Sequence, residues 1–262
     1  MGLILENINY KEYLSDITYD FLDGKINGLY GNNANYIIDI INGDISDYDG
    51  VVKYDDNVMD HDYYKVYPST VALIESKPFF YTDLVLDEFR FNLDFRNCDI
   101  EILETKSKEL LNLVGLDEEI LKRNIHTLSF SEKYLLSIAV NLIYEPDIII
   151  FKDIFNGLDR NNKKKVTVII KNLKETKKNI IVSSNDTNVL YELVDDILLL
   201  DGSLIYNFGD SEKIFTSPEV MKENVIPMPY ITKVTYLAKN KKVKLSYHKD
   251  VRDIIKDIYK HV

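Results

Sequence analysis

The sequence predicts an α/β protein built around a parallel sheet, and three observations lead to this fold class. Residues 148–151 form an all-apolar run of the kind found in strands that are covered on both faces. Residues 160–175 follow with apolar side chains at i, i+3, i+4 and i+7, the pattern of an amphipathic helix. A buried strand at 179–183, a helix at 187–194 and a strand at 197–200 repeat the alternation. Strand and helix in this order indicate the crossovers of a parallel sheet.

The N-terminal half predicts further strands and short helices. Residues 3–10 and 17–30 have strand patterns, and the second run ends in a glycine turn at Gly31. A short apolar helix is expected at 36–42, because a cluster of isoleucines there precedes the glycine stop Gly43. The other expected elements are strands at 51–54 and 71–74 and helices at 100–122 and 131–144.

The C-terminal part changes character after a hairpin. Asp201 and Gly202 predict a turn that leads into a strand at 204–206. Three prolines, Pro218, Pro227 and Pro229, then mark the start of a small helical tail that ends in Val251, Ile254, Ile255 and Ile258. We therefore expect a main domain at 1–210 and a C-terminal extension at 211–262.

Composition excludes several classes of function. The net charge of −11 and the pI near 4.9 make a nucleic-acid partner unexpected, because an acidic chain repels phosphate backbones. Cys98 is the single cysteine, which fits a reducing compartment. There is no signal-peptide pattern, no apolar run of the ~20 residues that a membrane span needs, and no metal-ligand spacing among the four histidines. We expect a cytoplasmic protein without a metal site, peripheral on the inner face of the cell membrane through a protein partner.

A series of segments, in order and at suitable spacing, resembles the motifs of ABC ATPases over about residues 3–210. The signature region, Leu128-Ser129-Phe130-Ser131-Glu132-Lys133, and its distance from Asn156-Gly157-Leu158-Asp159 form the most specific part. The other segments resemble the strand pair before the phosphate loop, the opening of that loop, the Q-loop, the Walker B strand and the switch segment, and they lie at 16–26, 28–33, 76–78, 146–153 and 182–186.

This resemblance implies a P-loop NTPase fold of the ABC-ATPase type. Its parts would be a mixed or parallel sheet core, antiparallel N-terminal strands and a helical subdomain at about 80–140. Residues 217–219 and 228–231, followed by a lysine-rich helix, look like the C-terminal extension of energy-coupling-factor (ECF) ATPases. Those subunits work in pairs beneath a membrane transporter for vitamins or metal ions.

The chain lacks the phosphate-loop chemistry of that family. The pattern G-x-x-x-x-G-K-[ST] holds phosphates with backbone N–H groups and a lysine. Counted from Gly31, its second glycine, lysine and hydroxyl positions fall on Tyr36, Ile37 and Ile38, and residues 26–52 contain no Lys or Arg. If nucleotide binds at all, the remaining candidate ligands are Gly31, Asn32, Asn33, Ala34 and Asn35.

The hydrolytic positions have changed as well. The Asp-Glu pair that ends Walker B organises Mg²⁺ and positions water, and Lys152 and Asp153 stand there instead. Ser76 stands at the Q-loop position and Asn185 at that of the switch histidine; asparagine carries no charge and shuttles no proton. Of these, Asp153 alone has a side chain that could polarise water. Its alternative role is to cap or solvate the end of the strand.

The signature region leaves two interpretations open. In the family it acts across a dimer on the nucleotide of the partner, and Ser129, Ser131 and Glu132 retain polar groups there. Ser129 and Glu132 also form the sequence pattern of a capping box, which needs no ligand. Asp159 is likewise either a contact across the interface or the N-cap of the helix that follows.

Three functional hypotheses follow. The first is a catalytically degenerate ABC subunit, not itself a hydrolase, that pairs with a second ABC ATPase subunit and docks on a transmembrane subunit. The second is a diverged ATPase that still binds and hydrolyses ATP. The third is a soluble interaction protein that has left transport. We expect no required cofactor, with weak binding of ATP and Mg²⁺ left open.

Overall fold

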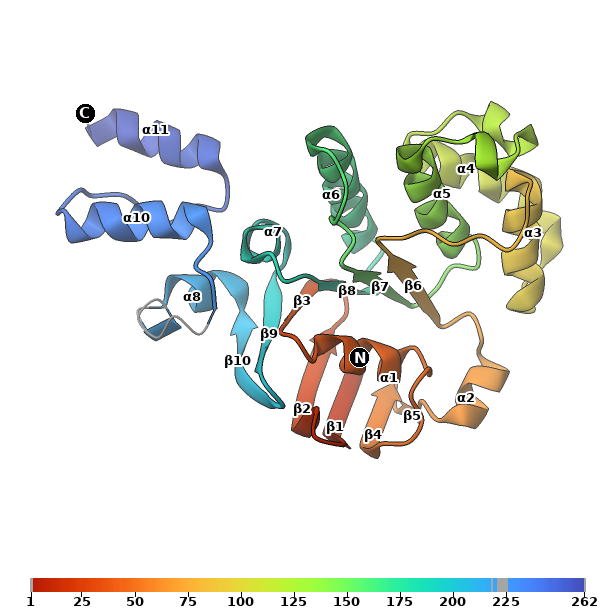
Figure 1. Cartoon of the computed structure of the whole chain (residues 1–262), viewed down its shortest axis with the longest axis horizontal. Coiled ribbons are helices and arrows are strands. Elements are labelled where there is room, and N and C mark those ends of the chain that lie inside the picture. The colour runs from red at the N-terminus through yellow and green to blue at the C-terminus, as the bar shows by residue number, and fades with distance from the viewer. Residues whose placement is uncertain (1, 218, 221–225, 262) are drawn as a thin grey trace.

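A computed structural model describes residues 2–217, 219–220 and 226–261, and its centre is a six-stranded mixed sheet (Figure 1). The strand order is β10-β9-β3-β8-β7-β6. All neighbouring strands are parallel except β9 and β10, which form an antiparallel hairpin. The strands of this sheet are β3 (Ile26–Tyr30), β6 (Val71–Glu75), β7 (Ile148–Lys152), β8 (Asn179–Ser183), β9 (Asp196–Asp201) and β10 (Leu204–Asp210). The predicted α/β class is confirmed.

Two hydrophobic cores lie on the two faces of this sheet. Alternate residues of β7 point in opposite directions, so Ile148 and Ile150 join one core while Ile149 and Phe151 join the other. The first core packs against helix α1 (Ala34–Ile41) and the N-terminal sheet. The second packs against the helices α3 (Val85–Phe95), α4 (Leu103–Val114), α5 (Phe130–Leu142), α6 (Arg160–Lys174) and α7 (Thr187–Leu193). Because helices or strands cover both faces, the central strands are mostly apolar, and their buried amides, on Asn27 and Asn179, donate hydrogen bonds.

The N-terminal strands form a separate antiparallel sheet. Its order is β2-β1-β4-β5, with bounds Leu14–Leu22, Gly2–Tyr10, Asp49–Tyr54 and Asn57–Val58. The strand pattern at 17–30 covers two strands, because a turn at Asp23 and Gly24 (φ +68°) sends the chain from β2 into the central sheet. Helix α1 lies between the two sheets (Figure 1). The helix begins at Ala34, two residues before the predicted start.

The helical region differs from the single helix expected at 100–122. Helix α4 ends at Val114, because Gly115 adopts a left-handed conformation (φ +74°). Asp117 then caps a short 3-10 helix (Glu118–Lys122) by accepting a hydrogen bond from the Glu119 N–H at 2.8 Å. Helix α3, which buries Val85, Phe89 and Leu93 along one face, and the short helix α2 (His61–Val66), which buries no side chain, were not predicted as individual helices.

The C-terminal extension holds three described helices, α8 (Ser211–Thr216), α10 (Tyr230–Asn240) and α11 (Val251–His261). Helices α10 and α11 lie at the opposite end of the molecule from α3 and α4 (Figure 1). The resemblance at 217–219 falls partly on Pro218, which lies outside the described residues. Within the described ranges, no helix is both long and apolar enough to cross a bilayer.

Asn27 ties the two sheets together, and its replacement tests how much that tie contributes. The buried amide of Asn27 donates to the carbonyl oxygens of Leu22 (3.0 Å) and Ile180 (3.2 Å), and its Oδ1 accepts from the Leu22 N–H (3.2 Å). We expect Asn27→Ala to lower the free energy of unfolding by about 2–3 kcal/mol, because buried polar groups lose their partner. Urea unfolding measures this loss. Asn240→Ala, on the exposed end of α10, is the control, with an expected change within ~0.5 kcal/mol; equal effects of the two variants would contradict the proposed tie.

Candidate functional site

The turn between β3 and α1 occupies the place of a phosphate loop, but it is very short. Gly31 has φ +130°, and a Cβ atom there would lie 2.8 Å from the Cβ and carbonyl oxygen of Leu200, so only glycine fits. The Ala34 N–H donates to the Gly31 carbonyl at 3.1 Å, and α1 begins at once. Asn32 and Asn33 alone separate the glycine from the helix. The turn therefore leaves two residues between Gly31 and the helix, where the pattern G-x-x-x-x-G-K-[ST] has four residues between its glycines.

The candidate nucleotide ligands of this turn have different surroundings. The side-chain amide of Asn33 donates to the carbonyl oxygens of Tyr13 (2.8 Å) and Gly202 (3.0 Å), which fixes this turn against the β1–β2 and β9–β10 turns. Ala34 is buried in the core between the sheets. Asn32 and Asn35 are exposed. Asn33 and Ala34 therefore stabilise the turn and the core, and the side-chain amides of Asn32 and Asn35 lie on the surface.

Helix α1 turns the former lysine and hydroxyl positions into core positions. Ile37 and Ile38 are 1% and 0% exposed and pack between the two sheets. Tyr36, at the second glycine position, stacks on Tyr13 with ring centroids 4.3 Å apart, and Tyr10 lies 5.4 Å from Tyr36. The rings of Tyr10 and Tyr13 are thus packed against Tyr36 on α1. A charged side chain at position 37 would be buried in an apolar core, which costs free energy.

Lys152 occupies the metal-binding end of the Walker B strand and pairs with two carboxylates. Its Nζ lies 3.0 Å from Asp39 Oδ1 on α1 and 3.6 Å from Glu75 Oε1 at the end of β6. Burial lowers the pKa of Lys152, but the hydrogen bond and charge of Asp39, with Glu75 behind them, raise it more, so the net pKa lies above its usual value. The ammonium group is therefore charged at neutral pH and already has its partners.

Asp153 adds a further negative group at the same strand end. Burial raises the pKa of Asp153, and the charge of Lys152 partly offsets this rise. The backbone of Asp153 is left-handed (φ +50°), and its N–H donates to the Ser183 carbonyl at 3.0 Å. The strand end thus carries the ammonium group of Lys152, its two paired carboxylates on Asp39 and Glu75, and the carboxyl group of Asp153.

The remaining hydrolytic positions lie next to this centre. Glu75 is paired with Lys152 across β6 and β7, and Lys152 with Ser183 across β7 and β8. Ser76 follows β6 directly and is partly buried, while Asn185 is exposed just beyond β8. The fold thus assembles the positions of an ABC site at neighbouring strand ends. Their side chains are a hydroxyl, an ammonium, one carboxylate and an amide.

The signature region has the geometry of a capped helix. The Ser129 Oγ accepts from the Glu132 N–H at 3.3 Å, and Glu132 Oε2 accepts from the Ser129 N–H at 2.8 Å. These hydrogen bonds, with the charge of Arg123 3.7 Å away, hold the pKa of Glu132 below its usual value. The capping box is therefore present at the start of α5. Phe130, 49% exposed, projects beside it.

Asp159 and Ser131 are joined through Asn162, a residue that the sequence did not single out. Asp159 Oδ1 accepts from the N–H groups of Asn161 and Asn162 at 2.8 and 2.9 Å, which lowers the pKa of Asp159. The Asn162 amide then donates to Ser131 Oγ (2.9 Å) and Asp159 Oδ2 (2.8 Å). The N-cap role of Asp159 is present. The signature helix and α6 are thereby held in one fixed relation.

Asp39 is the second residue that sequence reasoning missed. It is the sole charged residue in the apolar run 36–42, which was the available signal. Its partner Lys152 lies 113 positions away in the chain, so no local pattern connects the two.

A family model described as ABC transporter matches residues 14–156, which is 143 of the 262 residues. The chain belongs to the ABC transporter family. The match runs from β2 through the phosphate-loop turn, the signature region and the Walker B strand to Asn156. The motifs between residues 14 and 156 therefore have ABC ancestry.

Relatives of known name extend this result. A putative ABC transporter ATP-binding protein of Pyrococcus furiosus is 34% identical over 146 residues, 56% of this chain and 52% of the relative. An ECF transporter ATP-binding protein, EcfA2, of Mycoplasmoides gallisepticum is 32% identical over 128 residues, 49% of this chain and 40% of the relative. The chain thus spans about half the length of these two. EcfA1 of Mycoplasma mobile is 27% identical, with 90% of both chains covered.

Solved structures share the fold at low sequence identity. CbiO1 of Clostridium perfringens, described as part of the ABC transporter complex CbiONQ, has a TM-score of 0.74 at 17% identity. The match covers 89% of this chain and 98% of the CbiO1 chain. A putative metal-chelate type ABC transporter in an inward-facing conformation has a TM-score of 0.68 at 18% identity, covering 84% of this chain and 87% of that one. The ABC-ATPase fold expected from the motifs is confirmed.

Removal of the Lys152 ammonium group tests the ion pair at the centre of the site. Lys152→Met leaves the Asp39 carboxylate half-buried without a counterion, so we expect the free energy of unfolding to fall by about 1–3 kcal/mol. The double variant Lys152→Met/Asp39→Leu removes both charges and should recover most of this loss. Urea unfolding measures all three proteins.

Lys65→Met is the matched control, because Lys65 pairs with Asp62 at the same 3.0 Å but on an exposed surface. We expect it to change stability by no more than ~0.5 kcal/mol. If the double variant lost further stability, as two independent substitutions would, Lys152 and Asp39 would not act as a pair.

Proposed function

We propose that this chain is a non-hydrolysing ATP-binding-cassette subunit that pairs with a competent ATPase subunit on a membrane transporter. The observation that carries the proposal is the centre of its own site. Ile37 and Ile38 are buried where a phosphate-binding lysine and a hydroxyl would stand, and the one nearby ammonium group, on Lys152, is held by Asp39 and Glu75.

The charged groups around the site support this proposal. A hydrogen bond to a charged group contributes about 1.5–3 kcal/mol, and a phosphate loop makes several of them at once. Nucleotide would have to displace a carboxylate from Lys152 and enter beside Asp153, whose charge opposes the phosphates. Mg²⁺ would meet the ammonium group where the family has a carboxylate. Both costs oppose ATP binding and hydrolysis in this chain's own site.

The signature region supports a role in the site of a partner. Ser129, Phe130 and Asp159 are exposed, and the capping box and Asn162 hold them in a fixed arrangement. In the composite arrangement of the family, this region faces the nucleotide on the second subunit. The composite site we propose uses the partner's phosphate loop and this chain's Ser129 region.

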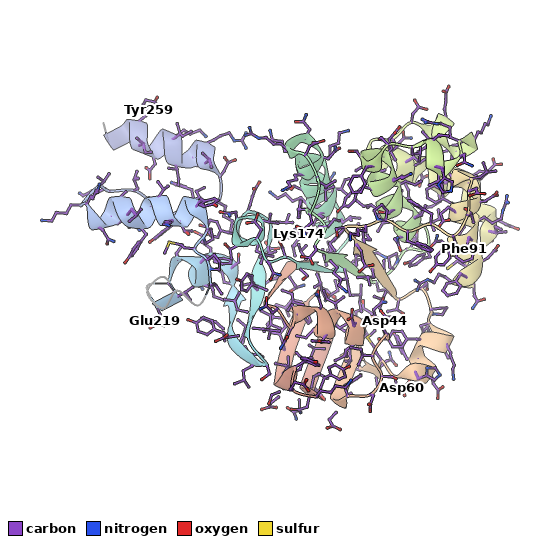
Figure 2. All side chains as sticks on the ribbon, viewed as in Figure 1. Asp44, Asp60, Phe91, Lys174, Glu219 and Tyr259 are labelled. Atoms are coloured by element: carbon purple, nitrogen blue, oxygen red, sulfur yellow. The ribbon has the colours of Figure 1, made fainter. Side chains whose placement is uncertain are left out.

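A membrane subunit is the second proposed partner. Large aromatic side chains, Phe79, Tyr81 and Phe95, are exposed around a cavity of about 280 Å³ between the helical subdomain and β6. Phe91, which lines the same cavity, lies at the far end of the molecule from Tyr259 (Figure 2). Exposed apolar patches of this kind mark interaction sites. Relatives named as ECF transporter ATP-binding proteins support an assignment to that type of transporter, on the inner face of the membrane.

Direct binding of Mg-ATP to the purified chain tests the proposal against the diverged-ATPase alternative. We expect no saturable heat by calorimetry up to about 1 mM nucleotide, because a dissociation constant above 1 mM is worth less than about 4 kcal/mol. Binding tighter than about 100 μM, roughly 5.5 kcal/mol, would contradict the proposal. Co-purification with an ABC ATPase subunit, and ATP turnover by that complex, then separates the transporter subunit from a protein that has left transport.

Ser129→Asp tests the composite site without disturbing the fold. Aspartate is an N-cap as good as serine, so the stability of the chain should change by less than ~0.5 kcal/mol. The new carboxylate would repel the phosphates bound by the partner, and we expect ATP turnover of the complex to fall at least about tenfold.

Ser129→Ala is the matched control for this variant. It loses the cap and about 1 kcal/mol of stability but adds no charge. If Ser129→Asp left turnover of an intact complex unchanged, the signature region of this chain would not face nucleotide.

A further inference from the structure

Positive charge is concentrated in one part of the C-terminal extension. Residues 226–249 contain six lysines and no aspartate or glutamate, although the whole chain has a net charge of −11. Because this stretch contributes +6, the rest of the chain carries −17. The stretch comprises α10 and the segment that leads to α11, and both helices lie beyond the two sheets at one end of the molecule (Figure 1). An acidic protein thus has a basic surface at this end.

Four of the lysines gather where α10 ends, and all four are exposed: Lys239, Lys241, Lys242 and Lys244. Three of these, Lys239, Lys242 and Lys244, line one shallow hollow of about 510 Å³ together with Val243. The Lys239 ammonium group lies 3.9 Å from the centre of the Tyr247 ring, a contact that orients the side chain. The ammonium groups therefore surround a common space.

These four ammonium groups have no counterions in the ranges that the structure describes. None of them forms an ion pair with a described residue. The carboxylates of the adjoining helix α11 are paired within the extension, Asp250 with Arg252, Asp253 with Lys256, and Asp257 with His248. Like charges this close together repel one another, so an anionic partner at the hollow would be stabilising.

Lys242 stands at a position where lysine has a conformational cost. Its φ is +63°, directly after the end of α10, and the Val243 N–H donates to the Ala238 carbonyl across it at 3.0 Å. Glycine or asparagine is preferred at such a helix end, because a longer side chain is strained in the left-handed conformation. The dipole of α10 favours cations in its last turn, which accounts for Lys239 but not for Lys244, beyond the helix. Local stability therefore does not explain this group of lysines.

The surroundings of the lysines favour a short acidic partner over an extended one. Leu237 and Val243 are 51% and 45% exposed beside them, so the surface is apolar as well as basic. Charges interact over about 8–10 Å at physiological salt. A membrane surface or a long nucleic acid would therefore also meet the negative charge of the rest of the chain. A short peptide meets the lysines alone, and an apolar residue within it would cover Leu237 and Val243.

We propose that this basic surface, defined by Lys239, Lys241, Lys242 and Lys244, binds a short acidic segment of another protein. The segment would be rich in aspartate and glutamate, with apolar residues among them. Its carboxylates would pair with the ammonium groups around the hollow. This inference does not depend on whether the chain binds or hydrolyses ATP, because the surface shares no residue with the nucleotide site.

Two labelled peptides of equal length test the proposal on the full chain by fluorescence anisotropy. One has three Asp-Glu-Asp-Leu repeats, and its neutral counterpart has three Asn-Gln-Asn-Leu repeats. We expect the acidic peptide to bind with a dissociation constant below about 100 μM at 50 mM salt. Binding should weaken at least about tenfold at 300 mM salt, because salt screens the ion pairs. The neutral peptide should show no saturable binding.

Three outcomes of this experiment would overturn the proposal. The first is no saturable binding of the acidic peptide, or equal binding of the two peptides. The second is tighter binding of a 12-nucleotide single-stranded DNA or of phosphatidylserine vesicles, which would assign the surface to another class of partner. The third is salt-sensitive self-association of the chain alone, since a second copy would then occupy the surface.

Lys242→Asn separates binding from stability. Asparagine suits the left-handed conformation and removes the charge, so we expect the dissociation constant for the acidic peptide to rise at least about threefold without a fall in melting temperature. Lys177→Asn is the matched control, because Lys177 is also an exposed lysine in the left-handed conformation (φ +59°) but follows α6. It should leave peptide binding unchanged. Equal affinities of the two variants for the peptide would show that the lysines after α10 do not form the site.

Discussion

The ammonium group of Lys152 holds together three elements that an ABC site needs in register. It joins the end of β7 to Asp39 on α1 and to Glu75 at the end of β6. A divalent cation can join carboxylates from separate elements, but it does so only while it is bound. A lysine makes the same kind of connection permanently, because the charge is part of the chain. The arrangement thus gives structural order to a strand end that would otherwise carry unbalanced acidic groups.

Helix α1 depends on that connection because it has no other charged anchor. Its remaining inward-facing residues are isoleucines and an alanine that pack between the two sheets. The short turn at Gly31 and the Asn33 amide place the start of the helix, and Asp39 fixes its middle. At the positions where the phosphate-loop pattern has a lysine and a hydroxyl, Ile37 and Ile38 extend the core between the two sheets.

The signature region and the start of α6 keep exposed polar side chains, whereas the phosphate-loop positions 37 and 38 are buried isoleucines. Ser129, Glu132, Asp159 and Asn162 form local hydrogen bonds that keep the signature helix and α6 in place while remaining exposed. Helix capping favours these groups at the surface, and the proposed composite site with a partner subunit would use the same groups. Experiments that keep the cap and change the charge can separate these two roles.

The sequence by itself determined the fold class, the order of the motifs and the absence of a phosphate-binding lysine, because these follow from local periodicity and from residue types at fixed spacing. It did not determine the split of residues 17–30, the break at Gly115, or the pairing of Lys152 with Asp39. The split and the break depend on single turn residues with φ above zero, and propensity patterns average over such residues. The ion pair joins positions 113 residues apart, and only the packing of α1 against the central sheet brings them within hydrogen-bond distance.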